Sequence, residues 1–234
     1  MKFTWFENNS FLIDSAYPQK ILLNPSSNVL STLNSSSNFL ILYPSKNFEV
    51  LPTTLLNNAV VLDPTKSFSD ENISITAYSS FMDNINGLKR GENFIYSIIL
   101  NSIKIVHLGF LGCIPDSSIL QAIANPDILF IPIGGNLCLD AISAKKLINL
   151  LSPKFTIPMN YKYEQNLFYY DGLHKFITTQ KEVIKLSTST LHYQDLDKFP
   201  LNSTLILTPK TKNNQGIALT PWFYIILYIL VTCI

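Results

Sequence analysis

The residue types that most often carry out chemistry are few in this chain and far apart. The three histidines are His107, His174 and His192, and their spacing matches no metal-binding motif. The three cysteines include no CxxC pair, which argues against a thiolate zinc site and against a disulfide framework. Cys138 has no histidine near it in sequence, so a structural thiol is favoured over a nucleophile. Asp140 precedes a helical pattern and is better explained as a helix cap than as an acid catalyst.

Composition and charge limit the class of partner. Apolar residues make up 47% of the 234 residues and charged residues 14%, where about 25% charged is usual. The formal net charge is +1 and Arg90 is the only arginine, so no nucleic-acid partner is expected. Residues 1–7 lack the features of a secretory signal and the cysteines are unpaired by pattern, which predicts a cytoplasmic domain. The partner that remains is a small molecule or a protein of unknown identity.

The elements that would position a site change character along the chain. The first half predicts strands at residues 2–6, 10–14, 20–23, 39–43, 60–62, 73–78, 94–100 and 103–107. The second half predicts helices after Asp116 and Asp140 and at 173–177, alternating with strands at 127–133, 154–159, 183–186 and 203–207. The Ser/Asn-rich tract 24–38 is expected to be a solvated loop. This order predicts an α/β fold of two sheets with helices outside them, an αββα layering.

The C-terminal segment differs from the rest of the chain. Residues 1–209 are expected to form one domain, 210–215 a polar linker, and 216–234 an apolar tail without a charged side chain. A helix of this length would span about 30 Å, close to the thickness of a bilayer core. Trp222 and Tyr224 suit an interfacial position, whereas Pro221 weakens the start of such a helix. The tail is a candidate transmembrane helix and membrane anchor, and the alternative is a buried strand or helix of the domain.

Six short segments resemble a known family. They are KFTWF with SFLI at residues 2–6 and 10–13, KILLNP at 20–25, SFMD with RGEN at 80–83 and 90–93, HLGFLG at 107–112, IPIGG at 131–135 and IPMNY at 157–161. In this order they resemble the metallo-β-lactamase superfamily, specifically bacterial metal-dependent hydrolases of the lactonase-like kind. The resemblance covers about residues 1–209. It implies a four-layer αββα fold and, in the family, hydrolysis at a dinuclear zinc site.

The resemblance also shows where the family would hold its metal ions. Its main ligand cluster, HxHxDH, follows a buried strand like 39–43, and here that strand is followed by PSKNFE at 44–49. The residues at the family's ligand positions are Pro44, Lys46, Phe48, Glu49, Met82, Phe110 and Asn160. All depart from the family's His or Asp, and most lack a donor suited to zinc. We therefore expect no metal, no zinc cofactor and no catalytic residues of the family type.

The replacements are consistent with a filled pocket. Phe48, Phe110 and Met82 are apolar and would pack together where charged ligands once met. Lys46 and Glu49 would pair at the rim. The alternative is drift after loss of activity, with solvent in whatever cavity remains.

The sequence favours a catalytically inactive pseudoenzyme with a binding or scaffold role, with Lys46 as an anion contact in the case of a binder. The alternative is a metal-dependent hydrolase with an altered site, using Glu49, Asp83 and Asn160. His107 also lies near this presumed pocket, but the resemblance places it at a position that is not a ligand. No substrate follows from either interpretation.

Overall fold

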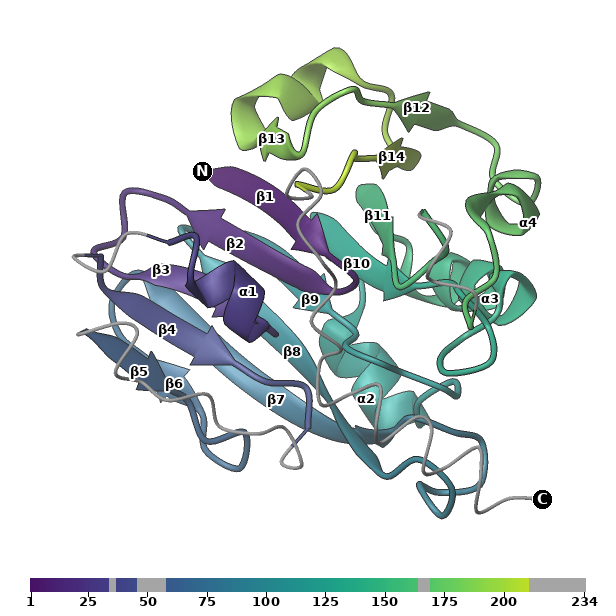
Figure 1. The fold of residues 1–234 in the computed structure, drawn as a ribbon, viewed down its shortest axis with the longest axis horizontal. Helices are drawn as coiled ribbons and strands as arrows, with labels where there is room; N and C mark the ends of the chain where they lie inside the picture. Colours follow the sequence, from purple (N-terminus) through teal and green to yellow (C-terminus); the bar gives the residue numbers. More distant parts are fainter. Residues whose placement is uncertain (34–36, 46–57, 164–168, 211–234) are drawn as a thin grey trace.

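The computed structural model describes residues 1–33, 37–45, 58–163 and 169–210. Within them, two mixed sheets lie face to face (Figure 1). The six-stranded sheet has the order β13 (Thr190–His192), β1 (Lys2–Glu7), β2 (Ser10–Asp14), β3 (Lys20–Leu23), β4 (Phe39–Leu42), β5 (Ala59–Val61). The eight-stranded sheet has the order β12 (Val183–Lys185), β14 (Ser203–Ile206), β11 (Phe155–Met159), β10 (Ile128–Pro132), β9 (Ile103–His107), β8 (Glu92–Leu100), β7 (Ile73–Phe81), β6 (Phe68–Ser69). The expected α/β fold with two sheets is therefore observed.

In the middle of the six-stranded sheet, β4 and most of β2 and β3 are apolar because both faces of the sheet are buried there. On β2, Phe11 and Ile13 join the main core, where the Phe11 ring lies 4.3 Å from that of Phe130 on β10. Leu12 points to the opposite face and packs with Val29 of the short helix α1 (Ser27–Leu30). Because successive side chains of a strand alternate between faces, a strand buried on both faces reads as a continuous apolar run.

Three helices pack against the eight-stranded sheet. They are α2 (Ser117–Ile123), α3 (Ala141–Leu151) and α4 (Leu173–Ile177), and a 3₁₀ helix follows at Tyr193–Lys198. Asp140 caps α3 as expected, since its carboxylate accepts the Ser143 N–H at 2.7 Å. Asp116 occupies the same position before α2 but makes no side-chain capping hydrogen bond, so the expected cap is wrong there.

The structure corrects the predicted elements in a few places. The tract 24–38 is not all loop, because Ser26 caps α1 by accepting the Val29 N–H at 3.2 Å. The strands β6 and β13 were not predicted, and β7 extends to Phe81 rather than ending at residue 78. The predicted strands 94–100 and 103–107 are observed as β8 and β9, which pair as an antiparallel hairpin. Its turn residues Asn101 and Ser102 have φ values of 50° and 65°, which a two-residue hairpin turn of type I′ requires.

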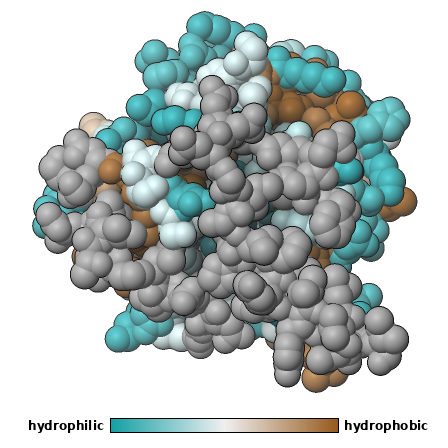
Figure 2. Space-filling model, viewed as in Figure 1, coloured by the Kyte–Doolittle hydropathy of each residue, from teal (hydrophilic) through white to brown (hydrophobic). Residues whose placement is uncertain are grey.

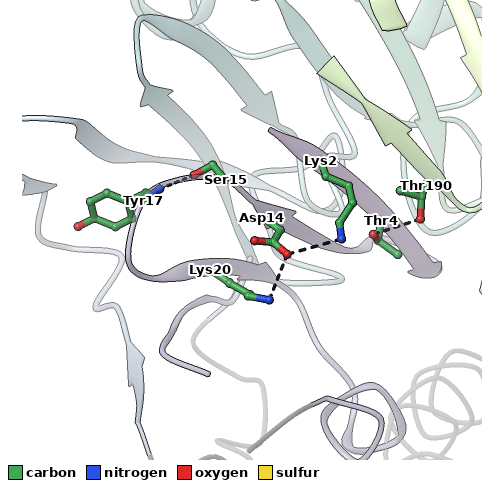
Figure 3. Close-up of polar contacts among 7 residues, drawn as sticks. All are labelled: Lys2, Thr4, Asp14, Ser15, Tyr17, Lys20 and Thr190. Carbon is green, nitrogen blue, oxygen red and sulfur yellow. Dashed lines mark hydrogen bonds and ion pairs between the residues drawn. The ribbon is translucent and has the colours of Figure 1, made fainter. Parts of the chain in front are cut away.

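Charged side chains of the six-stranded sheet gather at the end of β1 where the chain begins. Asp14 Oδ2 forms ion pairs with Lys2 Nζ at 3.6 Å and with Lys20 Nζ at 3.1 Å (Figure 3). The turn from β1 to β2 lies at the other end of the same strands. The ion pairs around Asp14 are thus remote from the β1–β2 turn.

The described surface in the view of Figure 2 is hydrophilic around much of the rim, with a hydrophobic patch at the upper right.

The candidate transmembrane helix lies outside the described residues. In the ranges that the structure describes, no helix is both long and apolar enough to cross a bilayer. The apolar tail 216–234 lies outside those ranges. The described chain ends at Lys210, whose N–H donates to the carbonyl oxygen of Trp5 at 3.0 Å.

The difference between the two helix starts predicts a difference in stability. Asp140→Ala removes the hydrogen bond to Ser143 and should lower the free energy of unfolding by about 1 kcal/mol. Asp116→Ala is the matched control, because Asp116 has the same backbone position without the bond. Chemical denaturation of both variants checks this, and equal losses would contradict the assignment of the cap.

Candidate functional site

The candidate site lies at the edge where β4, β7, β9 and β11 end. Four of the predicted site residues are described, and each follows one of these strands: Pro44, Met82, Phe110 and Asn160. Asn160 Nδ2 donates to the carbonyl oxygen of Gly109 at 3.3 Å. A Cβ placed on Gly109 would lie 2.7 Å from Cβ of Pro44. The fold therefore brings residues from both sheets together here, whereas Lys46, Phe48 and Glu49 lie outside the described residues.

Met82 and Phe110 share an apolar cluster. Each side chain is 7% exposed, and both belong to the cluster that contains Phe6 and Tyr43. The expectation that these two replacements pack among apolar groups is met. Phe48, the third member of the expected plug, lies outside the described residues. Two positions that the sequence resemblance assigns to charged or imidazole ligands thus contribute apolar surface.

The buried amide of Asn93, at the start of β8, holds this edge in place. Its Nδ2 donates to the Ser80 hydroxyl at 2.9 Å and to the Leu108 carbonyl oxygen at 3.0 Å. Its Oδ1 accepts the Phe110 N–H at 2.7 Å. Asn93 is fully buried, and these bonds satisfy its donors and one acceptor position. Asn93 belongs to the RGEN segment, but the sequence indicates no role for it, because its partners lie on β7 and in the segment that follows β9.

The end of β4 is tied to the opposite sheet through backbone carbonyl groups. The Tyr96 hydroxyl donates to the Tyr43 carbonyl oxygen at 2.7 Å, and the Phe94 N–H donates to the Pro44 carbonyl oxygen at 2.7 Å. Burial raises the pKa of Tyr43 to about 12 and also raises that of Tyr96. Both phenols are therefore neutral near pH 7, and neither is a base.

His107 is a structural residue of the core. Its Nε2 lies 3.0 Å from the Asn9 carbonyl oxygen, and its Nδ1 accepts the Gly109 N–H at 3.3 Å. These partners make Nε2 the donor of a neutral ring. Burial lowers the pKa of His107 to about 4, although the bond to Asn9 acts in the opposite direction. With both ring nitrogens engaged, His107 is not free to bind a metal ion or to accept a proton at neutral pH.

Asp83 faces its own loop rather than the strand ends. Its two carboxylate oxygens accept the N–H groups of Ile85, Gly87, Lys89 and Arg90 at 2.7–3.0 Å. Burial alone would raise the pKa of Asp83, but these N–H groups favour the charged form and the net effect lowers it. A carboxylate that accepts this many bonds is committed to folding the loop. Its expected role as a residual metal ligand is not supported.

Cys138 is an inert thiol, as the sequence favoured. It is 7% exposed, and its Sγ lies 3.7–4.0 Å from the carbonyl oxygens of Gly135, Leu139 and Asn160. Burial raises its pKa to about 12. Because the thiolate is the reactive form, this residue is a poor nucleophile.

The donors at this edge do not fit a zinc pair. Zinc takes cysteine sulfur, imidazole nitrogen or carboxylate oxygen. Pro44 and Phe110 have no donor in the side chain, Met82 offers a weak thioether, and Asn160 offers an amide oxygen. Over residues 1–33, 37–45, 58–163 and 169–210, no three His, Cys, Asp or Glu side chains are grouped as metal ligands would be.

The low pKa of His107 predicts a pH-dependent stability. Unfolded His107 titrates near 6.5 and the folded residue near 4, so below pH 6.5 the unfolded state binds more protons. Stability should fall by about 3 kcal/mol as the pH drops from about 6.5 to about 4.

Denaturation curves measured across this pH range check the prediction. His107→Gln, which lacks the ionisation and keeps a donor for Asn9, should lose most of this dependence. His174→Gln, at an exposed position on α4, is the control and should keep it. A His107→Gln protein with an unchanged pH profile would assign the effect to other groups.

Comparisons with known proteins identify the family that shares this fold. A family model described as a beta-lactamase superfamily domain matches residues 2–160. A UPF0173 metal-dependent hydrolase from Thermoplasma volcanium is 28% identical over 105 residues, which cover 44% of this chain and 47% of the relative. One from Carboxydothermus hydrogenoformans is 44% identical over 55 residues, 24% of each protein. The chain thus spans less than half the length of the curated relatives it matches.

Solved structures show the same fold at low identity. A metallo-beta-lactamase superfamily protein from Thermotoga maritima has a TM-score of 0.68 and 20% identity, covering 88% of this chain and 99% of its own. Igni18, a metallo hydrolase from Ignicoccus hospitalis, has a TM-score of 0.58 and 12% identity, covering 90% and 96%. With two mixed sheets, strand ends that meet at one edge and a family match over most of the described domain, the chain belongs to the metallo-beta-lactamase superfamily.

Proposed function

We propose that this chain is a superfamily member without hydrolytic activity, which acts as a binding or scaffold protein. The observation that carries the proposal is the set of side chains where the strands end. Pro44, Met82 and Phe110 present apolar or weakly donating groups, and Asn160 presents a neutral amide. A dinuclear hydrolase depends on ligands that lower the pKa of a metal-bound water, and these residues do not supply them.

The neighbouring groups do not replace the metal in its chemical role. His107 is neutral with both nitrogens bonded, Asp83 is saturated by backbone N–H groups, and Cys138 is a protonated thiol. A general base must have a pKa near the working pH and reach the reacting proton. None of these three side chains meets both conditions.

The alternative is a metal-dependent hydrolase with an altered site. The names of the curated relatives favour it. It would need Glu49 and Lys46, which lie outside the described residues, together with Asp83 and Asn160. The bonds of the Asp83 carboxylate weaken this alternative. In the binding role, Lys46 would be the anion contact.

We also propose that residues 216–234 hold the domain at a membrane. The support is the composition of the tail, with its uncharged apolar run and its aromatic residues near the start.

The metal content tests the loss of the zinc site. Full-length protein purified without chelators from zinc-supplemented cells should contain zinc far below one equivalent, by elemental analysis. The control restores His at positions 44, 46, 49, 82 and 160 and Asp at 48 and 110, and a gain of zinc there shows that the assay detects a site. One equivalent of zinc or more in the unaltered chain would overturn the proposal.

Fractionation tests the anchor. The full chain should pellet with membranes and resist alkaline carbonate extraction. A matched control, Ile226→Lys with Ile229→Lys, places two charges in the tail and should release the protein, because charged side chains are costly in hydrocarbon. If the unaltered chain stays in the supernatant, the tail has another role.

A further inference from the structure

Buried polar atoms without partners occur on neighbouring residues beside the candidate site. Within the part of the chain that the structure describes, four buried side-chain atoms have no hydrogen-bond partner: Asn8 Oδ1, Asn9 Nδ2, Ser10 Oγ and Asn160 Oδ1. Asn9 and Asn160 are fully buried and Ser10 is 2% exposed. Both residues of the β1–β2 turn and the first residue of β2 thus share this property with the residue that follows β11.

Hydrogen bonds hold these residues against one another. The Asn160 N–H donates to the Asn8 carbonyl oxygen at 3.3 Å. The Asn9 carbonyl oxygen lies 3.0 Å from His107 Nε2, and Asn9 Oδ1 accepts from Asn24 Nδ2 at 2.5 Å. The backbone of Asn160 is in the left-handed region, with φ of 52°. These bonds therefore hold the backbones of Asn8 and Asn160 side by side and fix the side chain of Asn9.

Buried polar atoms without a partner in the chain indicate that another molecule completes their hydrogen bonds. A buried donor or acceptor without a partner destabilises the folded state, and native proteins pair nearly all such groups with protein or ordered water. The four atoms comprise two amide oxygens, one amide NH₂ group and one hydroxyl. A complementary group must donate to the oxygens and accept from the NH₂ of Asn9.

The charges around these atoms favour a neutral occupant. His107 is neutral because its pKa is lowered to about 4. Glu7, next to Asn8, accepts the Ser26 hydroxyl through Oε1 at 2.5 Å, and Asp83 is turned into its own loop. Among the described residues, neither His107, Glu7 nor Asp83 would serve as a buried counter-charge for an ion in a site of amide and hydroxyl groups. A hydroxyl or carboxamide group meets the same donors and acceptors without needing a counter-charge.

We propose that Asn8, Asn9, Ser10 and Asn160 form a buried site for an uncharged hydrogen-bonding group, either ordered water or the hydroxyl or amide end of a small molecule. This inference rests on the proposed absence of zinc, since a metal ion at the strand ends would be coordinated by Asn160 Oδ1. The proposed site defines which chemical groups a protein with the binding role would recognise. It also gives a function to the polar turn between β1 and β2.

Crystals of the full chain, grown without polyols and then soaked in acetamide, distinguish the two sources. We expect ordered water within hydrogen-bond distance of Asn160 Oδ1 and Asn9 Nδ2 before soaking. Acetamide in its place would show that the site takes an amide, and retained water would identify water as the occupant. Well-ordered side chains with no density beside them, or pairing of all four atoms with the chain itself, would overturn the site. Metal density, checked by anomalous scattering, would refute the zinc-free proposal instead.

Melting temperatures give an independent test in solution. If the Ser10 hydroxyl is bonded to an occupant, Ser10→Ala should lower the melting temperature by about as much as Ser203→Ala. Ser203 is the matched control, because it is fully buried on β14 and its hydroxyl donates to the Pro200 carbonyl oxygen at 2.5 Å. If the Ser10 hydroxyl has no partner, its removal should leave the melting temperature unchanged or raise it, and that result would overturn the proposal.

Discussion

The buried amide of Asn93 is the contact on which the geometry of the candidate site depends. It joins Ser80 on β7 to Leu108 and Phe110 after β9, so Met82 and Phe110 are held at fixed positions relative to each other. Gly109 must approach Asn93 and Pro44 closely, and its φ of 61° suits glycine. Because a buried amide without partners is strongly unfavourable, this edge can form only when all three segments are in place. The architecture around the candidate site is thus held by the hydrogen bonds of a neutral, buried amide.

Much of the fold could be predicted because its strands are buried. Phe39–Leu42 and Ile128–Pro132 are apolar throughout, and runs of this length between polar turns are typical of strands covered on both faces. The elements that were missed owe their structure to tertiary contacts. Thr190–His192 is a strand only because it pairs with β1, and Ser27–Leu30 is a single helical turn whose Val29 is held by packing.

The candidate site was predictable in position but only partly in chemistry. The resemblance located Met82, Phe110 and Asn160, and the structure brings these residues to one edge. The sequence could not show that Asp83 would accept backbone N–H groups from its own loop, because these groups converge only after the loop has folded. Nor could it show that Asn9 and Ser10 are buried beside Asn160, since polar residues between two strands usually mark a solvated turn.

The pairing of β13 with β1 has a consequence for synthesis of the protein. Residues 2–4 pair with residues 190–192. The strands β12 and β14, which precede and follow β13 in the sequence, belong to the other sheet. During translation the first strand must therefore wait, with one edge unpaired, until almost the whole domain has left the ribosome. Such long sequence separations slow folding and leave an open edge that other chains can join. Nascent chains stalled before residue 190 should for this reason depend most on chaperones.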